Sequence, residues 1–201
     1  MVYGIYKGGN VIAKFVAPTG VISNNPVRFS DTISLKRQIT RMSAQRWEIA
    51  SSVEPLVVGA QELFVDLVVN GHSEAIVATM PQNYGAVQNT TANSVVTSLG
   101  ASAGSNVVGV TNSNGVISKG TFVRFAGLDT KVYMVTEDLN GDGNLQIFPK
   151  LRKDVANTAV MSYRDDVLLS CLYDTDTITG MSYSDGILMD VGTVKLVEKL
   201  T

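Results

Sequence analysis

Short β-prone runs, separated by glycine, asparagine and proline, recur along this chain and restrict it to a mainly β fold. Each run is bounded by residues that favour tight turns, as expected where a chain repeatedly reverses direction. Short strands at this spacing are typical of a small OB-like β-barrel. In the second half the runs occupy 107–111, 121–126, 131–137, 145–148 and 167–173.

The first half of the chain predicts a further β unit with one main helix. Apolar residues alternate in 33–41 and 45–53, which we interpret as an antiparallel hairpin. A helix is expected at about 55–69, because Pro55 suits a first helical turn and Asn70 follows the last apolar position. The apolar face of this helix should cover the sheet with Leu56, Ala60, Leu63, Phe64, Leu67 and Val68.

These elements predict a split organisation, in which one β-barrel or sandwich module is interrupted by a second, OB-like barrel. Residues 1–30 are rich in glycine, asparagine and proline, and are interpreted as an extended arm. Residues 31–83 plus 176–201 form the first module, and the alternating stretch that ends the chain supplies its closing strand. Residues 84–175 form the inserted barrel, within which 85–104 is assigned to no element.

Composition argues against several classes of function. The chain has 201 residues, with 16 Lys and Arg against 18 Asp and Glu, so its net charge of -2 gives no reason to expect nucleic-acid recognition. No apolar run approaches the roughly 20 residues that span a membrane. The single histidine, His72, is expected in a solvated loop, and the single cysteine, Cys171, in the core.

A motif that begins at Asp138 matches the opening of a calcium-binding loop. Asp138, Asn140 and Asp142 stand at alternate positions, and Gly143 occupies the sixth. The twelfth position, where a bidentate glutamate should complete the ligand shell, is Pro149. A hairpin turn explains the same residues, because Asn-Gly and Asp-Gly tolerate positive φ. We therefore interpret the motif as a turn, with a weak cation site as the alternative.

Basic residues gather near the predicted hairpin, at Lys36, Arg37, Arg41 and Arg46. They are candidates for salt bridges at an interface between subunits, with a phosphate-binding patch as the alternative. The single tryptophan, Trp47, lies on an alternating strand and is expected in the structural core.

No arrangement of residues points to catalysis. The glycine-rich stretches lack the lysine and serine or threonine of a phosphate loop, and no glycine motif follows a strand and opens a helix. A nucleophile elbow is also missing, because the Gly-x-Ser-x-Gly frame is not found. We expect a protein that is not an enzyme and carries no cofactor.

Several stretches resemble one protein family. Residues 43–49 (SAQRWEI), followed by the proline-led helix, resemble the first module of phage distal tail proteins and related baseplate hub ring proteins. Residues 120–127 (GTFVRFAG), 131–136 (KVYMVT) and 145–152 (LQIFPKLR) resemble the OB-like domain inserted in such proteins. Residues 192–200 (GTVKLVEKL) are similar to the last strand of the family.

The resemblance implies a structural virion component of a bacteriophage tail tip or baseplate, assembled in the bacterial host cytoplasm. Its first module would form a homohexameric ring that joins the tail tube to the distal hub. The implied partners are other copies of the chain, the tail tube protein, and baseplate or tail-tip hub proteins. Alternatives are a carbohydrate- or receptor-binding OB-type module of the tail and a hub adaptor of a contractile-tail baseplate.

Overall fold

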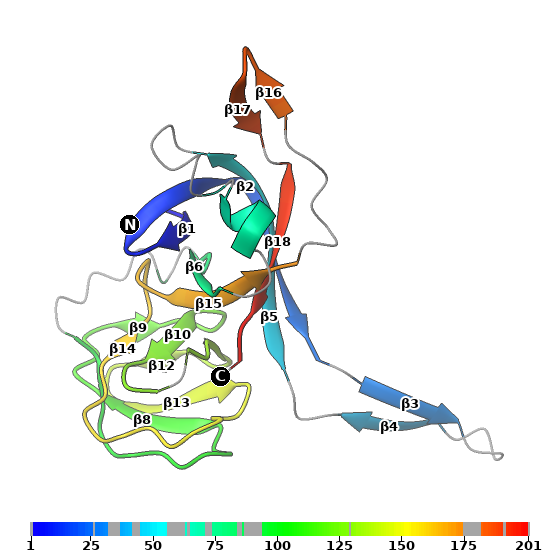
Figure 1. Ribbon diagram of the computed structural model, residues 1–201. Coiled ribbons are helices and arrows are strands. Elements are labelled where there is room, and N and C mark those ends of the chain that lie inside the picture. The colour runs from blue at the N-terminus through cyan, green and yellow to red at the C-terminus, as the bar shows by residue number, and fades with distance from the viewer. Residues whose placement is uncertain are drawn as a thin grey trace.

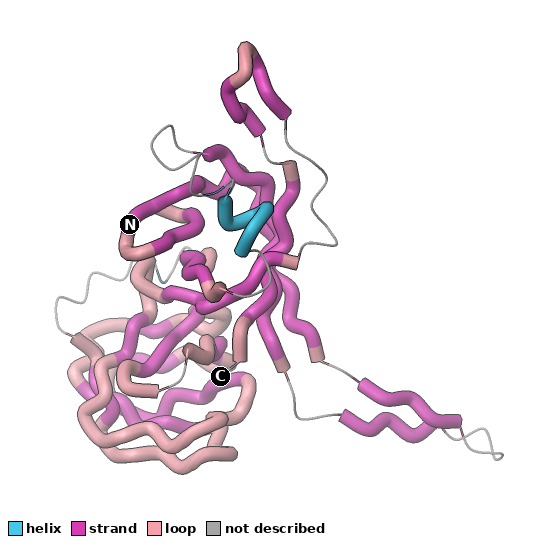
Figure 2. The backbone as a smooth tube through the Cα atoms, viewed as in Figure 1, coloured by secondary structure: helices cyan, strands magenta, loops and turns pink. Residues whose placement is uncertain are grey.

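The protein is mainly β in the part of the chain that the structure describes. The computed structural model describes residues 2–25, 27–31, 37–41, 45–55, 63, 65–70, 74–83, 86, 94–128, 130–174, 182–190 and 192–200. Strands dominate these residues, and a short π-helix, η1 (Asp66–Asn70), lies against one of the sheets (Figure 2).

Six strands close into a barrel in the order β1-β2-β5-β18-β15-β6, called the first barrel below (Figure 1). All neighbours whose pairing is resolved run antiparallel. Alternate residues of each strand point inward, as the two-residue period of a strand requires, and build one apolar core around Ile5, Trp47 and Leu169. The strands are β1 (Gly4–Lys7), β2 (Asn10–Asn24), β5 (Arg46–Pro55), β6 (Ile76–Thr79), β15 (Leu168–Tyr173) and β18 (Thr193–Glu198).

A second sheet has the order β14-β10-β11-β13-β8-β7, and its strands lie in the chain between β6 and β15. An isolated bridge between Val96 and Val160 brings its two outer strands together, so this sheet also curls around a core of its own. Beside it, β9 (Val116–Ile117) pairs with β12 (Leu139–Asn140). The six strands are β7 (Val96–Thr97), β8 (Val107–Thr111), β10 (Phe122–Phe125), β11 (Tyr133–Val135), β13 (Gly143–Phe148) and β14 (Met161–Ser162).

The second sheet is apolar on both faces where it meets the first barrel. On β10 and β11, Val123 and Tyr133 point into the core of the second sheet. Their neighbours Phe122 and Met134 point the other way and pack against the core of the first barrel. Alternate side chains of β10 and β11 thus enter two different cores. The face that packs against the first barrel attaches the second sheet to it.

Two hairpins form two-stranded sheets of their own. One is formed by β3 (Val27–Asp31) and β4 (Arg37–Arg41), and the other by β16 (Ser182–Ser184) and β17 (Ile187–Asp190). Figure 1 shows them at separate corners of the molecule, with β16–β17 above the barrel and β3–β4 extending sideways from its lower end. The turn at Asp185-Gly186 has positive φ at both residues, as a two-residue type I′ hairpin turn requires.

The interpretation of residues 1–30 as an extended arm is wrong. Strands β1 and β2 belong to the first barrel, and the side chains of Ile5, Ile12 and Ala13 are buried in its core. The turn-forming residues that suggested an arm instead make the tight reversal between β1 and β2, where Gly8 and Gly9 have positive φ.

One predicted strand pairing and the assignment of one strand to the inserted barrel are also wrong. Residues 33–41 and 45–53 do not form a hairpin with each other, because β4 pairs with β3 while β5 pairs with β2 and β18. The run 167–173 was predicted in the inserted barrel, but β15 lies between β6 and β18 of the first barrel. Its inward side chains, among them Leu169 and Cys171, fill the first core rather than the second.

The predicted helix at 55–69 is described only in part. Residues 56–62 and 64 lie outside the described residues. They include Leu56, Ala60 and Phe64 of the expected apolar face. Leu63 and Leu67 are buried as expected, whereas Val68 is 60% exposed. The described turn is a π-helix, whose wider winding changes which side chains share a face, so a period of 3.6 residues misplaces Val68.

Glycine is required at position 4, where β1 and β2 approach closely. A Cβ atom placed there would lie 2.1 Å from the carbonyl oxygen of Ala13, a backbone atom that cannot move aside alone. We therefore expect Gly4→Ala to lower the free energy of unfolding by about 1–3 kcal/mol, the usual range for overpacking. Chemical denaturation measures this loss.

Gly20→Ala is the matched control, because a Cβ there would meet the carbonyl oxygen of Ala50 at an ordinary 3.6 Å. Both glycines lie in strands of the same barrel and neither has positive φ. If Gly4→Ala and Gly20→Ala unfold at the same denaturant concentration, the close approach of β1 to β2 is contradicted.

Candidate functional site

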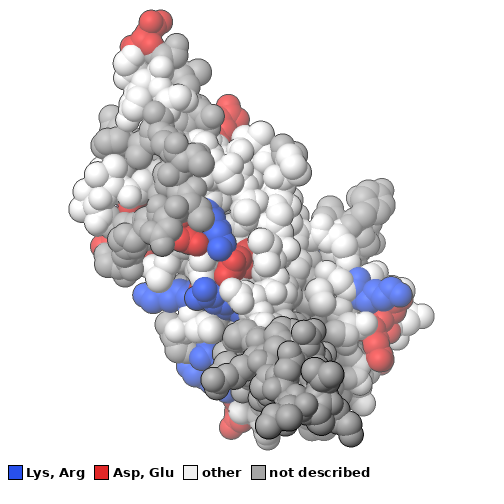
Figure 3. All heavy atoms as spheres, turned by 90° about the vertical axis from the view of Figure 1, so that its right-hand side faces the viewer, with Lys and Arg blue, Asp and Glu red and all other residues white. Residues whose placement is uncertain are grey.

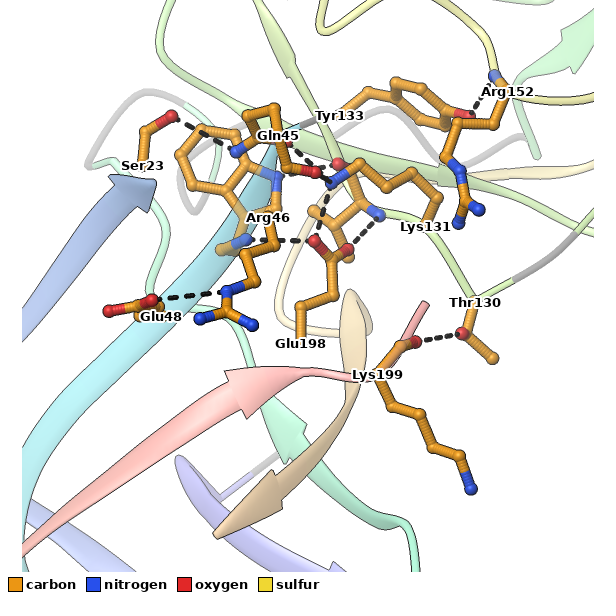
Figure 4. A network of polar contacts seen from close by, with 12 residues as sticks. Ser23, Gln45, Arg46, Glu48, Thr130, Lys131, Tyr133, Arg152, Glu198 and Lys199 are labelled. Carbon is orange, nitrogen blue, oxygen red and sulfur yellow. Dashed lines mark hydrogen bonds and ion pairs between the residues drawn. The ribbon is translucent and has the colours of Figure 1, made fainter. Parts of the chain in front are cut away.

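A buried ion pair joins the first barrel to the second sheet. Lys131 precedes β11 of the second sheet, and Glu198 ends β18 of the barrel; the Lys131 Nζ lies 2.6 Å from the Glu198 Oε2, with both side chains fully buried. The same Nζ donates to the side-chain oxygen of Gln45 at 2.6 Å and to its carbonyl oxygen at 3.0 Å. The three N–H groups of the ammonium thus have three acceptors (Figure 4).

The carboxylate of Glu198 is satisfied from both sheets. Its Oε2 accepts from the backbone N–H of Trp47 at 2.9 Å, and its Oε1 accepts from the backbone N–H of Val132 at 3.3 Å. Burying two charges is tolerated only when hydrogen bonds satisfy them both, as they do here. These five residues, Gln45, Trp47, Lys131, Val132 and Glu198, are called the junction below.

Trp47 contributes both a side-chain hydrogen bond and an aromatic contact to the junction. Its indole Nε1–H donates to the carbonyl oxygen of Val132 at 2.7 Å. Its ring meets the edge of Phe122 at a centroid distance of 5.1 Å and an interplanar angle of 84°, a favourable edge-to-face arrangement. The side chain is 3% exposed, so Trp47 lies in the structural core and at the boundary between the two sheets.

A second set of hydrogen bonds crosses the same boundary after β6. The Gln82 side chain donates to the carbonyl oxygen of Phe122 and accepts from its N–H, both at 2.9 Å, as a neighbouring strand would. Asn83 donates to the carbonyl oxygen of Lys119 at 3.0 Å and to the hydroxyl of Thr121 at 3.3 Å. The second sheet is therefore held at two separate places, which fixes its orientation.

The junction is suited to mechanical attachment rather than to chemistry on a ligand. Both charged groups are fully buried, and their hydrogen-bonding positions are occupied by the protein. A general acid or base must reach a proton on its substrate, which these atoms cannot do. The arrangement attaches the two sheets to each other through a buried contact.

A partly exposed ion network lies on the outer face of the barrel, formed by Asn24, Arg46, Glu48, Asp174 and Lys195. The Lys195 Nζ lies 3.0 Å from Glu48 Oε2 and 3.2 Å from Asp174 Oδ2, and the Arg46 Nε lies 3.4 Å from Glu48 Oε1. Asn24 donates to Glu48 Oε1 at 2.8 Å. Figure 3 shows basic and acidic atoms side by side on this face, rather than a field of one sign.

The ion network controls the acidity of Glu48. Burial raises the pKa of its carboxyl group, but hydrogen bonds from Asn24 and Lys195 and the charges of Lys195 and Arg46 outweigh burial, so the pKa is lowered below its usual 4.5. For Lys195, hydrogen bonds to Glu48 and Asp174 raise the pKa of the ammonium above 10.5. Each charged form is therefore favoured by folding.

Stability should consequently depend on pH through Glu48. A carboxyl group with a lowered folded pKa stabilises the protein above its unfolded pKa of 4.5, and this stabilisation is lost as pH falls through the folded pKa. We expect the stability difference between wild type and Glu48→Gln to be constant near neutral pH and to shrink below about pH 4.5. Urea denaturation at a series of pH values measures it.

Glu54→Gln is the matched control, because Glu54 lies on the same strand, is exposed, and takes part in none of the ion pairs described. A difference for Glu48→Gln that stays constant down to about pH 3 would show that the carboxylate gains nothing from these partners.

The residues of the calcium-like motif are engaged separately. Asp138 accepts from the backbone N–H of Lys119 at 2.6 Å, whereas Asp142 accepts from the Thr111 hydroxyl and the Ser113 N–H, both at 2.8 Å. Asn140 lies in β12, opposite Val116 of β9. The motif forms a turn between β12 and β13, and these strands pair with β9 and β8 rather than with each other. Within the described residues, no cluster of three or more His, Cys, Asp or Glu side chains is placed to hold a metal ion.

Of the four basic interface candidates, Arg46 is the one whose side chain the structure describes. Arg46 begins β5 and pairs with Glu48, with about half of its side chain exposed. Arg37 and Arg41 are the end residues of β4. Lys36 lies outside the described residues, as does His72.

Sequence reasoning missed the junction apart from Trp47. The sequence places Lys131 at the start of the predicted strand 131–137 and Glu198 in the closing strand, and the two residues are 67 positions apart in the chain. No local pattern marks a lysine or a glutamate as buried. The only usable signal is the position of both residues next to buried apolar runs.

Cys171 is fully buried in the first core. Desolvation, together with the charge of Glu198, raises the pKa of its thiol, so the reactive thiolate is disfavoured. None of the helices in the described residues is long and apolar enough to cross a membrane.

Comparison with protein-family models finds none that matches the chain, and comparison with curated proteins finds no matching relative.

Proposed function

We propose that this protein is a structural component of a bacteriophage tail tip or baseplate, which forms a hexameric ring joining the tail tube to the distal hub. In this proposal the first barrel is the ring-forming module, and the second sheet is an OB-like insert on its outside. The sequence resemblance suggests the identity, and the arrangement of rigid and unpaired parts supports a role in assembly.

The observation that carries the proposal is the junction, together with one open edge of β2. Lys131 and Glu198 are buried and hydrogen-bonded, so the two sheets are joined by a specific contact, as suits a subunit that a ring or tube repeats. Within the described residues, β2 pairs only with β5 from Val16 to Asn24, so its other edge has no ladder partner. Unpaired edges favour pairing with another chain.

Exposed apolar side chains accompany this open edge. Val16 is 42% exposed and Ile22 is 49% exposed on β2. Single exposed apolar residues are ordinary, but two on a strand with one open edge mark a surface suited to a neighbouring strand. Pro18, between them, limits the length of continuous pairing.

The carbohydrate-binding alternative receives less support from the second sheet. Sugar sites commonly stack a ring on an exposed aromatic side chain. The aromatic residues of the described stretch 94–164 are all buried or half-buried. They are Phe122, Phe125, Tyr133, Phe148 and Tyr163.

Mass measurement by light scattering, combined with negative-stain imaging of the purified protein, tests the proposal. We expect six-fold rings with a mass close to six times the 21.5 kDa of one chain. Monomeric protein over the whole measured concentration range would contradict the ring. A monomer that binds glycans would favour the carbohydrate-binding alternative.

A further inference from the structure

Three side-chain groups that can react with one another meet at the junction. The Lys131 Nζ lies 2.6 Å from the side-chain oxygen of Gln45 and 2.6 Å from Glu198 Oε2 (Figure 4). A lysine amine is a nucleophile, a carboxamide carries an electrophilic carbon, and a carboxylate can move protons between them. The hydrogen bonds of the junction therefore place an attacking group, an acceptor and a base beside one another.

The fold buries these groups and holds them in place. The side chains of Lys131 and Glu198 are fully buried, and Gln45 is 5% exposed. Burial leaves the amine unsolvated and protects an intermediate from hydrolysis. Gln45 directly precedes β5, Lys131 lies shortly before β11, and Glu198 ends β18, so paired strands fix all three. Their approach needs no further ordering when they react.

The amide nitrogen of Gln45 is directed toward the surface. Its Nε2 donates to the Ser23 hydroxyl at 3.1 Å, and Ser23 is an exposed residue of β2. Figure 4 shows Gln45 between Ser23 on one side and Lys131 on the other. A nitrogen released from Gln45 would therefore leave beside an exposed residue, on the side away from the attacking amine.

We propose that Lys131 and Gln45 join in an isopeptide bond, which links the second sheet covalently to the first barrel. The Lys131 ammonium passes one proton to Glu198, and the neutral Nζ bonds to the side-chain carbonyl carbon of Gln45. A second proton moves from Nζ to Nε2, and the bond between Nε2 and the carbonyl carbon breaks. The ammonia takes up the proton held by Glu198 and leaves as ammonium, which restores the carboxylate. The reaction needs no oxidant and no added reactant.

The bond closes a long loop in the chain. Gln45 and Lys131 are 86 positions apart. A covalent link between distant positions restricts the unfolded chain and so stabilises the folded one. All three reacting residues belong to one chain, so this inference goes beyond the proposed ring and does not depend on it.

A second group of lysine, carboxylate and amide on the barrel supplies an internal control. The Lys195 Nζ lies 3.0 Å from Glu48 Oε2, and the Asn24 amide nitrogen donates to Glu48 Oε1 at 2.8 Å. The Asn24 amide is thus engaged with the carboxylate rather than with the amine, and 28% of the Lys195 side chain is exposed. We expect no bond between Lys195 and Asn24.

The intact mass of the purified wild-type protein tests the proposal. We expect a mass lower than that of the sequence by one molecule of ammonia. An Asn-Gly turn such as Asn140-Gly141 can also lose ammonia, by closing a ring on its own backbone. Tryptic digestion and peptide sequencing must therefore find Gln45 and Lys131 in one branched peptide, with no cleavage after Lys131.

Gln45→Met is the matched variant, because it removes the attacked carbon but keeps the length of the side chain and the pair of Lys131 with Glu198. It should have the full mass of its sequence, and it should unfold at a lower urea concentration than wild type because it lacks the link.

Glu198→Gln and Glu198→Asp test the carboxylate as the base. The linked fraction, followed by mass from the start of cell-free synthesis, should form at least about 100-fold more slowly in these variants. Tryptophan fluorescence shows whether each variant is folded. If neither folds, the wild-type mass and the branched peptide still decide whether the bond exists.

Three outcomes would overturn this inference. The first is folded wild-type protein that keeps the full mass of its sequence after prolonged incubation. The second is a loss of ammonia that maps to an Asn-Gly turn while trypsin still cleaves after Lys131. The third is a bond that forms as fast in folded Glu198→Gln as in wild type, which would remove the proposed base. None of them bears on the ring, which light scattering tests separately.

Discussion

Glu198→Gln is expected to lower the free energy of unfolding by about 3–5 kcal/mol, the cost of leaving one charge of a buried pair without its partner. The Lys131 ammonium would remain fully buried with neutral oxygens as its acceptors and no opposite charge beside it. Urea denaturation followed by the fluorescence of the single tryptophan measures the loss, and Trp47 reports on the junction itself.

A double-mutant cycle separates the ion pair from the surrounding packing. Lys131→Met should be destabilising for the same reason as Glu198→Gln, because it leaves the carboxylate buried with only backbone donors. The two changes together should be less destabilising than the sum of the single variants, because no unpaired charge remains. Additive effects would contradict the direct pairing of Lys131 with Glu198.

The partly exposed Lys195 supplies a matched control for the buried lysine. Its Nζ meets two carboxylates, whereas Lys131 meets one, but 28% of the Lys195 side chain remains exposed. Lys195→Met should therefore change stability by no more than about 1 kcal/mol, as is usual for surface pairs. A loss for Lys195→Met equal to that for Lys131→Met would mean that burial does not set the strength of the junction.

Trp47→Ala is expected to lower the free energy of unfolding by about 3–5 kcal/mol, the range for removing a large buried aromatic side chain. The variant loses the edge contact with Phe122 and the hydrogen bond to Val132, both of which cross to the second sheet. Hydrogen exchange should therefore increase on β10 and β11 as well as on β5. Circular dichroism during denaturation measures the loss of stability.

Trp47→Phe separates the two contributions of this residue. Phenylalanine retains a ring near Phe122 but has no N–H, so the carbonyl oxygen of Val132 loses its donor at a cost of about 1–3 kcal/mol. We expect a loss intermediate between wild type and Trp47→Ala. A Trp47→Ala variant that melts like wild type would contradict the place of Trp47 in the core of the first barrel.

The mainly β character of the chain and the core position of Trp47 follow from local pattern. Alternation of apolar and polar residues around Trp47 and Ile49 depends only on the two-residue period of a strand, and both side chains are buried. The turn at Asp142 follows from its Asn-Gly and Asp-Gly neighbours in the same way. The pairing partners of these strands do not follow from local pattern.

The partners of the strands depend on contacts between segments that are distant in the chain, so local sequence pattern does not predict them. Residues 33–41 and 45–53 are neighbours in the chain and both alternate, which favours a hairpin, yet β5 pairs with β2 and β18 instead. The barrel closes only because β15 and β18 return from beyond the second sheet to complete it. The alternation of β15 is equally compatible with either sheet, so the sequence does not decide between them.

By itself, the sequence determined that the chain forms short strands with tight turns around apolar cores, since these properties depend on residues within a few positions of each other. Only the tertiary structure decided that the first thirty residues supply two barrel strands, and that Lys131 and Glu198 are buried together. Solvation of a charged side chain depends on what packs over it. For Lys131 and Glu198, the covering residues come from strands that are distant in the chain.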